Sequence, residues 1–280
     1  PRIGRRAGAL LRAPFLRWSD RTVEEALRPV VRDPLLFDVL TGQCGDYGLT
    51  PRHASFAIHA MVAGHYERGG WYPIGGASRL AAGAEEVIAS AGGRIFTNAS
   101  VEAIVVERGR AVGVRMADGA EIRAPLVISD AGADATFRRL LPPAVAEATG
   151  LPARLRAVGP STGHLCLHLG FRGTDAELGL DGTNLWVYPA GDRERAFDRF
   201  AADPEAPLPL VYVSFPSAKD PSFGRRYPGR ATVEAITLAR MDWFRRWHAT
   251  RWRRRGAAYD DFKARLTERL LAVVFEHRPQ

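Results

Sequence analysis

The sequence predicts a mixed α/β (α+β) protein, and three observations support this class. Residues 1–70 carry short helical patterns that are separated by prolines. Residues 101–123 carry three short segments of alternating apolar residues, and residues 164–239 carry further strand-like segments. Of the 280 residues, 46% are hydrophobic and 25% are charged, which is typical of a folded globular chain and excludes a disordered tail, a collagen and a coiled coil.

The first 70 residues are predicted to form short helices, because each helical pattern begins at a residue that can cap a helix. Thr22 is followed three residues later by a glutamate, which is the spacing of a capping box. Asp33 precedes a proline that opens a helix over residues 35–40. Thr50 and the proline after it repeat this arrangement, so we expect a third helix from there to about residue 64.

The next segment is predicted to be a helix followed by a short strand. Apolar residues recur on one helical face over residues 78–91. The glycine pair at residues 92–93 ends this helix, because glycine readily adopts the left-handed conformation of a C-terminal cap. The strand is expected at residues 94–97.

A β-meander and a returning strand are expected after it. Three short alternating segments lie at residues 101–107, 111–116 and 121–123. The pair Asp118-Gly119 is a strong signal for a tight hairpin turn between the last two. The apolar run at residues 126–129 predicts a strand that is buried on both faces of a parallel sheet.

The remainder of the chain predicts a second, mainly antiparallel sheet and a closing helix. The strands are expected at residues 164–171, 184–188, 210–215 and 232–239. The helix begins near Tyr259 and carries its apolar residues on one face.

The chain is basic, with a formal net charge of +8, and the charge is spread over most of its length. One stretch, residues 241–256, is dense in arginine and carries Trp243, Trp247 and Trp252. It permits two readings: a basic module that binds a membrane surface or a nucleic acid, or a segment whose tryptophans face the core while its arginines are solvated. We favour the second reading and expect no nucleic-acid partner.

The spacing of reactive residues identifies no catalytic set, so the catalytic residues are unknown at this point. Cys44 lies in a glycine-rich loop with no base placed beside it. His164 and His168 lie on a predicted strand, where four residues span roughly 13 Å and cannot share a zinc ion. With only two cysteines in the chain, we expect no metal site and a reducing, cytoplasmic compartment, with association at the membrane surface as an alternative.

Several stretches, taken in order, resemble a known family. They include Gly-Asp-Tyr-Gly-Leu-Thr-Pro at residues 45–51, Gly-Trp-Tyr-Pro-Ile-Gly-Gly at residues 70–76 and Ser-Phe-Pro-Ser-Ala-Lys-Asp-Pro at residues 214–221. These resemble the flavoprotein superfamily of phytoene desaturases, carotenoid isomerases and retinol saturase, and the first and last runs are most similar to retinol-saturase-like members. The resemblance covers nearly the whole chain.

The resemblance implies an FAD-dependent oxidoreductase that acts on carbon–carbon double bonds of an apolar isoprenoid, with a nicotinamide cofactor, NAD(P), as a further candidate. It implies cofactor contacts from Val101 and from Ser129, Asp130, Ala131 and Gly132. It places Tyr72, Gly75 and Gly76 where the substrate meets the flavin. If the strands around Leu165 and Val211 line a substrate tunnel, their side chains form its wall; the alternative, which we favour for most individual residues, is plain core packing.

The resemblance also implies three parts: a helical part of the substrate domain at residues 1–70, a partial FAD-binding domain of the glutathione-reductase/amine-oxidase type at 71–145, and the rest of the substrate domain at 146–280. Family members open with a glycine-rich turn that holds the FAD pyrophosphate and end with a flavin-contacting segment, and this sequence shows neither. We therefore expect the interior of a longer enzyme, which on its own binds FAD weakly or not at all and does not turn over.

Overall fold

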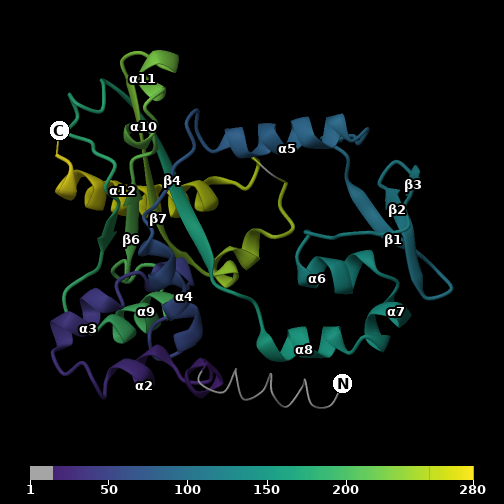
Figure 1. The fold of residues 1–280 in the computed structure, drawn as a ribbon, viewed down its shortest axis with the longest axis horizontal. Helices are drawn as coiled ribbons and strands as arrows, with labels where there is room; N and C mark the ends of the chain where they lie inside the picture. Colours follow the sequence, from purple (N-terminus) through teal and green to yellow (C-terminus); the bar gives the residue numbers. More distant parts are fainter. Residues whose placement is uncertain (1–14, 252, 280) are drawn as a thin grey trace. The chain divides into compact units, whose positions relative to one another are not determined.

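The computed structural model describes residues 15–251 and 253–279, and its chain divides into two compact units (Figure 1). The first unit combines Pro1–Ala81 with Thr162–Gln280, and the second is Ala82–Ser161. The sequence placed the corresponding boundaries after residues 70 and 145, so the second unit begins and ends later than we expected. The two units are described separately below.

The N-terminal helices of the first unit are α2 (Val23–Leu27), α3 (Pro34–Leu40), the 3-10 turn η1 (Cys44–Asp46) and α4 (Phe56–Tyr66). The capping box at Thr22 is confirmed, since its side chain accepts from the backbone N–H of Glu25 while the Glu25 carboxylate accepts from that of Thr22. The cap at Asp33 is also confirmed, because its carboxylate accepts from the Leu36 backbone N–H at 3.0 Å.

The predicted helix start at Thr50 is wrong: α4 begins at Phe56, and Ser55 caps it by accepting from the Ala57 backbone N–H at 3.2 Å. The reason is a distant partner. The Thr50 hydroxyl donates to the Glu194 carboxylate at 2.5 Å, so it does not cap a helix, and residues 51–54 form turns.

The second unit contains the end of α5 (Ser78–Ser90), which starts in the first unit, and a three-stranded antiparallel sheet in the order β1-β2-β3. The strands are β1 (Val101–Glu107), β2 (Arg110–Met116) and β3 (Glu121–Arg123). The short helices α6 (Ala133–Ala135), η2 (Thr136–Leu140), α7 (Pro143–Ala148) and α8 (Leu151–Val158) follow. The predicted helix and the meander are confirmed.

Two predicted strands of this unit are wrong. Residues 94–97 and 126–129 are extended or irregular but carry no strand ladder. Ile128, which we expected to be buried on both faces, is 87% exposed. The physical reason is the lack of neighbours: none of the described strands pairs with either segment, and an unpaired apolar run gains neither ladder hydrogen bonds nor burial.

The second sheet lies in the first unit and has four antiparallel strands in the order β4-β7-β6-β5. They are β4 (Gly163–Arg172), β5 (Leu185–Val187), β6 (Val211–Ser214) and β7 (Arg230–Ala239). The helix α9 (Arg193–Ala202) lies between β5 and β6 in the sequence, and α10 (Pro216–Lys219) and α11 (Phe223–Arg226) lie between β6 and β7. The four predicted strands are thus confirmed.

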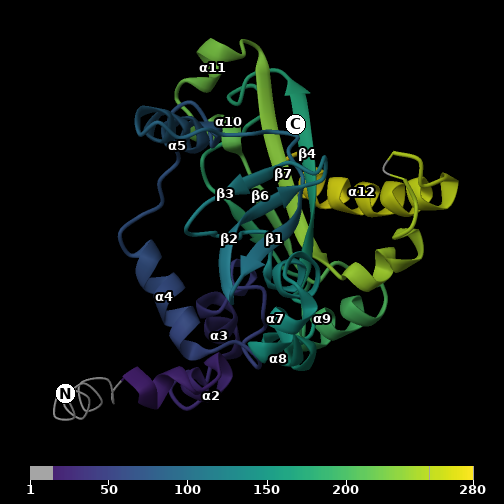
Figure 2. The same ribbon diagram turned by 90° about the vertical axis from the view of Figure 1, so that its right-hand side faces the viewer.

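One face of this sheet packs against the C-terminal helix α12 (Ala257–His277), as Figures 1 and 2 show. The shared core joins Leu270 and Val274 of the helix to a set of buried strand residues: Val211, Val213, Phe215, Val233 and Ala235. Because side chains alternate along a strand, the residues between these point to the opposite face, which is called the open face below.

Leu165 and Val211, for which a tunnel wall and core packing were the two alternatives, both pack in the core. Val211 is buried in the cluster under α12, and Leu165 packs against a smaller cluster of Trp247, Phe262 and Leu266. Val211 also lines the cavity beside α12 that is described below.

The arginine- and tryptophan-rich stretch at residues 241–256 also contributes to the core. Its first half is the 3-10 helix η3 (Met241–Trp247), whose Trp247 is buried and whose Trp243 packs against the same cluster. The Arg246 guanidinium lies 3.9 Å from the centre of the Trp247 ring. Trp252 lies outside the described residues. The tryptophans therefore anchor this stretch, and the reading as a membrane- or nucleic-acid-binding module is not favoured.

Candidate functional site

The residues that the resemblance singles out lie in both units. Val101 and the segment from Ser129 to Gly132 belong to the second unit, whereas Tyr72, Gly75 and Gly76 belong to the first. Each group is built from different elements and has its own environment.

Val101 begins β1, which is an edge strand of the three-stranded sheet. Val101 lies opposite Met116 of β2, and the ladder shifts register between Val101 and Ala103. Among the described residues, no strand pairs with the other edge of β1. Backbone N–H and C=O groups on that edge are therefore available to a ligand.

The segment from Ser129 to Gly132 is an exposed, extended connection that leads into α6. The Ser129 hydroxyl lies 2.7 Å from that of Thr136, which ties the segment to the first turns of the following helices. Gly132 has a φ of +87°, and a Cβ atom at this position would meet nothing within 4 Å. The backbone there is open on the outside, so another molecule can approach it closely.

Gly75 and Gly76 form a tight turn with φ values of +96° and +88°, a conformation that glycine adopts at little cost. The Gly75 N–H donates to both carboxylate oxygens of Asp220 at 3.1 Å. A Cβ atom at Gly75 would lie 2.8 Å from Cγ of Arg79. The positive φ favours glycine at Gly75, and a Cβ atom there would also force the Arg79 side chain to move.

Asp220 is the anchor of this turn and is only 3% exposed. Besides Gly75, it accepts from the Ser222 backbone N–H at 2.9 Å, from the Ser222 hydroxyl at 2.7 Å and from the Arg226 guanidinium. Burial on its own raises the pKa of Asp220, but the hydrogen bonds from Ser222, Gly75 and Arg226 outweigh it and hold that pKa well below its usual range.

The run at residues 214–221 supplies this anchor and several others. The Ser217 hydroxyl donates to Asp175 at 2.5 Å and accepts from the Thr232 backbone N–H at 2.9 Å. The Lys219 ammonium donates to the Ser214 hydroxyl at 2.7 Å and to the Asn184 side chain. The run was interpreted only through its resemblance, so the role of Asp220 was not predicted. The available signal was the charged pair Lys219 and Asp220 near the end of an otherwise uncharged run.

The open face of the four-stranded sheet carries polar residues in one row. His168 lies opposite Glu234, and Glu234 lies opposite Ser214. The Nδ1 atom of His168 lies 3.2 Å from Oε1 of Glu234. Burial and the carboxylates of Glu234 and Asp220 raise the pKa of Tyr72, which links the turn at Gly75 to this row. Glu234 was not predicted as a site residue either, although it is the one charge within residues 231–239.

Cys44 and the histidines show no reactive arrangement. The Cys44 thiol is buried 3.5 Å from the Tyr188 hydroxyl, which itself donates to the Gly42 carbonyl. Burial raises the pKa of Cys44, which disfavours the nucleophilic thiolate. Among residues 15–251 and 253–279, no three His, Cys, Asp or Glu side chains converge on a position that could hold a metal ion.

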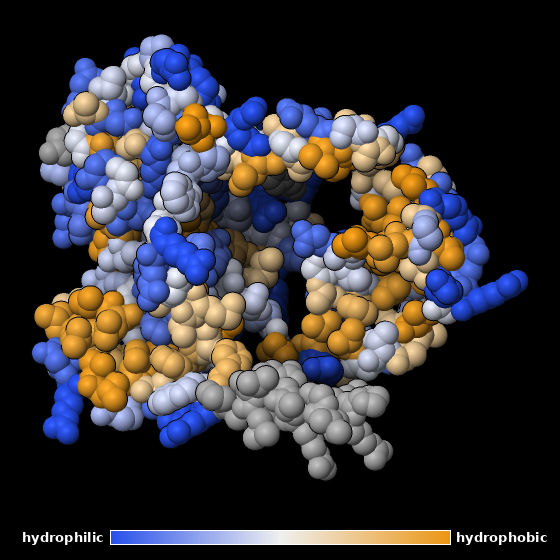
Figure 3. Space-filling model, viewed as in Figure 1, coloured by the Kyte–Doolittle hydropathy of each residue, from blue (hydrophilic) through white to orange (hydrophobic). Residues whose placement is uncertain are grey.

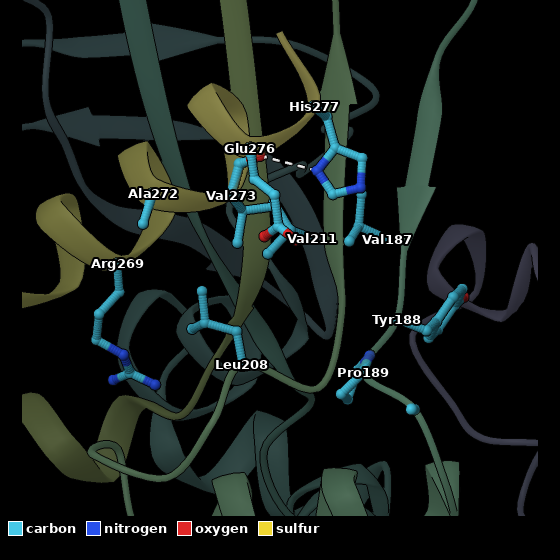
Figure 4. Close-up of a pocket in the computed structure, with 11 residues that line it drawn as sticks. Val187, Tyr188, Pro189, Leu208, Val211, Arg269, Ala272, Val273, Glu276 and His277 are labelled. Carbon is cyan, nitrogen blue, oxygen red and sulfur yellow. Dashed lines mark hydrogen bonds between the residues drawn. The ribbon is translucent and has the colours of Figure 1, made fainter. Parts of the chain in front are cut away.

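A cavity of about 500 Å³ opens beside α12 (Figure 4). The Arg269 guanidinium donates to the carbonyls of Pro204, at 2.6 Å, and Ala206, and His277 Nδ1 lies 3.0 Å from the Val273 carbonyl. These polar groups stabilise the helix and a nearby loop, so they do not form a reactive set. Apolar side chains form much of the lining: Val187, Leu208, Val211 and Val273.

The chain is similar to named proteins over nearly its whole length. It is 36% identical to all-trans-retinol 13,14-reductase of Homo sapiens over 284 residues, which is 98% of this chain and 47% of that protein. It is 27% identical to chloroplastic prolycopene isomerase of Arabidopsis thaliana over 256 residues, 89% of this chain and 39% of that protein. The chain spans about half the length of the curated relatives it matches. No protein-family model matches it.

The fold is also similar to a solved structure. The crystal structure of an oxidoreductase from Methanosarcina mazei superposes with a TM-score of 0.59 at 21% sequence identity, over 86% of this chain and 52% of that one. This likeness supports an α+β fold of the same kind. By its sequence similarity over nearly its whole length, the chain belongs to the superfamily of retinol-saturase-like and carotenoid oxidoreductases.

Proposed function

We propose that the protein containing this chain is an FAD-dependent oxidoreductase that acts on carbon–carbon double bonds of an apolar isoprenoid polyene. The observation that carries this proposal is the similarity to a retinol reductase over 98% of the chain, together with the similarity to a prolycopene isomerase. Both names describe changes at the double bonds of a polyene. Saturation, desaturation and isomerisation remain the three candidate outcomes.

The second unit fits a dinucleotide cofactor on two observations. The outer edge of β1 offers backbone groups at Val101, and the segment Ser129, Asp130, Ala131 and Gly132 offers an exposed backbone with open space at Gly132. We propose that these residues contact FAD, which when bound supplies hydride transfer to or from carbon. NAD(P) remains the candidate external source or acceptor of the electrons.

In the first unit, we propose that Tyr72, Gly75 and Gly76 lie on the substrate side of the site. Their support is the turn that Asp220 anchors and the electrostatic coupling of Tyr72 to Glu234 and Asp220. A turn that is held in this way positions Tyr72 rigidly, and a rigid aromatic side chain can orient an apolar chain.

We also propose that the protein associates with a membrane surface, from which an apolar isoprenoid would be taken up. The support is an apolar area formed by α3 and the turn at residues 28–30, and apolar side chains gather at the lower left of Figure 3. Its side chains are 46–76% exposed: Val30, Leu35, Leu36, Val39 and Leu40. Arg32, Asp33 and Asp38 border this area, so its exposed apolar side chains carry the proposal. No helix among the described residues is long and apolar enough to cross a membrane.

Co-flotation with vesicles that contain anionic lipid tests this association. The double variant Leu36→Glu/Val39→Glu should lose flotation, whereas Val158→Glu, which introduces a carboxylate at an exposed valine of the second unit, should keep it. If neither variant loses flotation, the area does not bind the membrane. If the wild type is a dimer in solution and the double variant is a monomer, the area instead binds a second copy of the chain.

The catalytic proposal is tested with the protein that contains this chain, incubated with FAD, a polyene alcohol and a chemical reductant or oxidant. Mass spectrometry should detect a polyene that has gained or lost two hydrogen atoms, or an isomer of unchanged mass. Bound flavin without any of these products would overturn the proposal.

The cofactor contacts are tested by a matched pair of variants. Gly132→Ala should weaken FAD binding several-fold, because a Cβ atom then blocks the close approach of the cofactor. Gly119→Ala, at a glycine with a similar φ of +89° and equal space, should leave FAD affinity unchanged. Equal affinities of both variants would place the cofactor elsewhere.

A further inference from the structure

The open face of the four-stranded sheet carries two neighbouring rows with different chemistry. The first row is polar and runs across three strands in register, from His168 through Glu234 to Ser214. The second row lies two residues further along each strand and is mainly aromatic and aliphatic. It consists of Cys166, Ile236, Tyr212 and Trp186.

The two rows lie close enough for one small molecule to contact both. Two residues along a strand span about 7 Å, which is the length of a few bonds of an extended carbon chain. The rings of Trp186 and Tyr212 pack together with centroids 4.7 Å apart and Ile236 lies opposite Tyr212, so these half-buried side chains form one apolar group, whose Trp186 ring also packs against Gly45. A molecule with one polar end and an apolar body matches this arrangement of a polar row beside an apolar row.

The polar row has unused capacity for hydrogen bonds. Glu234 uses Oε1 for His168, and within the described part of the chain no partner is found for its Oε2. The Lys219 ammonium has three N–H groups, of which the described residues Ser214 and Asn184 accept two. The side chains of His168 and Glu234 are 71% and 36% exposed, so a ligand can reach them.

The charges of the row favour a neutral polar end. Glu234 lies opposite Ser214, to which the Lys219 ammonium donates at 2.7 Å, so a carboxylate and an ammonium group both belong to this row. A ligand carboxylate would be attracted by Lys219 but repelled by Glu234, whereas a hydroxyl group can donate to the Glu234 carboxylate and accept from the Lys219 ammonium.

We infer that Glu234 and Lys219, at the centre of the polar row, bind the hydroxyl end of a polyene alcohol whose apolar body lies over Tyr212, Trp186 and Ile236. The hydroxyl donates to Oε2 of Glu234 and accepts from Nζ of Lys219. This inference rests on the proposed function for the apolar character of the substrate. It adds the polar group that is recognised and the residues that recognise it.

The test is equilibrium binding of three probes, measured by quenching of tryptophan fluorescence. The probes are all-trans-retinol, its methyl ether, which cannot donate a hydrogen bond, and retinoic acid, which carries a carboxylate. The wild type should bind the alcohol about tenfold more tightly than either of the others, because one hydrogen bond to a charged partner has about that effect.

The variants at Glu234 and Lys219 are expected to change the order of affinities for the three probes in opposite directions. Glu234→Gln should weaken the alcohol several-fold and strengthen the acid, since the repelling charge is gone while Lys219 remains. Lys219→Met should weaken the acid most. Glu268→Gln is the matched control, because Glu268 is exposed on α12, which covers the other face of the sheet. A loss of folding in any variant is detected by circular dichroism and would not reverse a preference.

The outcomes separate the two proposals. If the wild type binds all three probes alike and Glu234→Gln behaves as Glu268→Gln, the inference is overturned while the proposed substrate class stands. If the wild type binds no polyene at all, the proposed substrate class and the inference both fail.

Discussion

Replacing Gly75 by alanine should destabilise the first unit more than the same change at two neighbouring glycines. At φ +96°, an L-residue pays about 1–2 kcal/mol in backbone strain. Its Cβ atom would also lie 2.8 Å from Cγ of Arg79, and such overpacking adds about 1–3 kcal/mol. The expected loss is therefore about 2–5 kcal/mol, with a further weakening of the N–H bond to Asp220.

Two glycines near Gly75 separate these contributions. Gly69 has a φ of +84° but open space around it, so Gly69→Ala should show only the strain of about 1–2 kcal/mol. Gly70 has neither a positive φ nor a close neighbour, so Gly70→Ala should be neutral or stabilising by about 0.4–1 kcal/mol.

Urea unfolding followed by tryptophan fluorescence measures this series, because all described tryptophans belong to the first unit. The expected order of stability is Gly70→Ala, then Gly69→Ala, then Gly75→Ala. Equal losses at Gly69 and Gly75 would refute the reasoning, since the contact with Arg79 and the anchor at Asp220 would then contribute nothing.

Three further predictions concern stability. Because the folded-state pKa of Asp220 lies below its usual value of 3.8, its carboxylate stabilises the fold above that pH, and this stabilisation is lost as the pH falls through the folded-state pKa. Urea midpoints of the wild type and Asp220→Asn should therefore differ at pH 7 and converge in acid; a constant difference would contradict this. Trp247→Ala should lower the free energy of unfolding by about 3–5 kcal/mol, because Trp247 fills a core cluster. An unchanged urea midpoint would contradict this and would favour a binding role for the tryptophans. Thr22→Ala should lower it by about 1 kcal/mol through loss of the capping box, whereas Thr22→Ser should restore most of it.

Local patterns predicted most of the secondary structure. The capping box at Thr22 and the Asp118-Gly119 turn depend on residues within a few positions of each other, and the structure confirms the elements that they begin or join. The errors arose where a contact with a residue far away in the sequence determines the local secondary structure. Thr50 does not start a helix because its hydroxyl binds Glu194, which is 144 positions away. The apolar run before Ser129 is not a strand because no described strand lies beside it.

The site could be predicted only in part for the same reason. The sequence drew attention to Gly75 and Gly76, but their partner Asp220 lies 145 positions further along the chain. The neighbours of Glu234 are set by the register of three strands, which places it between His168 and Ser214. Pairing of this kind depends on the whole sheet and leaves no periodic signal in one segment.

The insertion of the second unit between the two segments of the first has a consequence for the order of folding. Hydrogen bonds from Thr50 to Glu194, from Gly75 to Asp220 and from Tyr188 to Gly42 join partners that are 144–146 positions apart. During synthesis, the N-terminal helices must wait for the later strands, whereas the hairpins of the second unit find their partners within a few residues. The middle of this chain should therefore fold before its beginning, and a ribosome stalled near residue 161 should carry a protease-resistant meander beside N-terminal helices that are still cleaved.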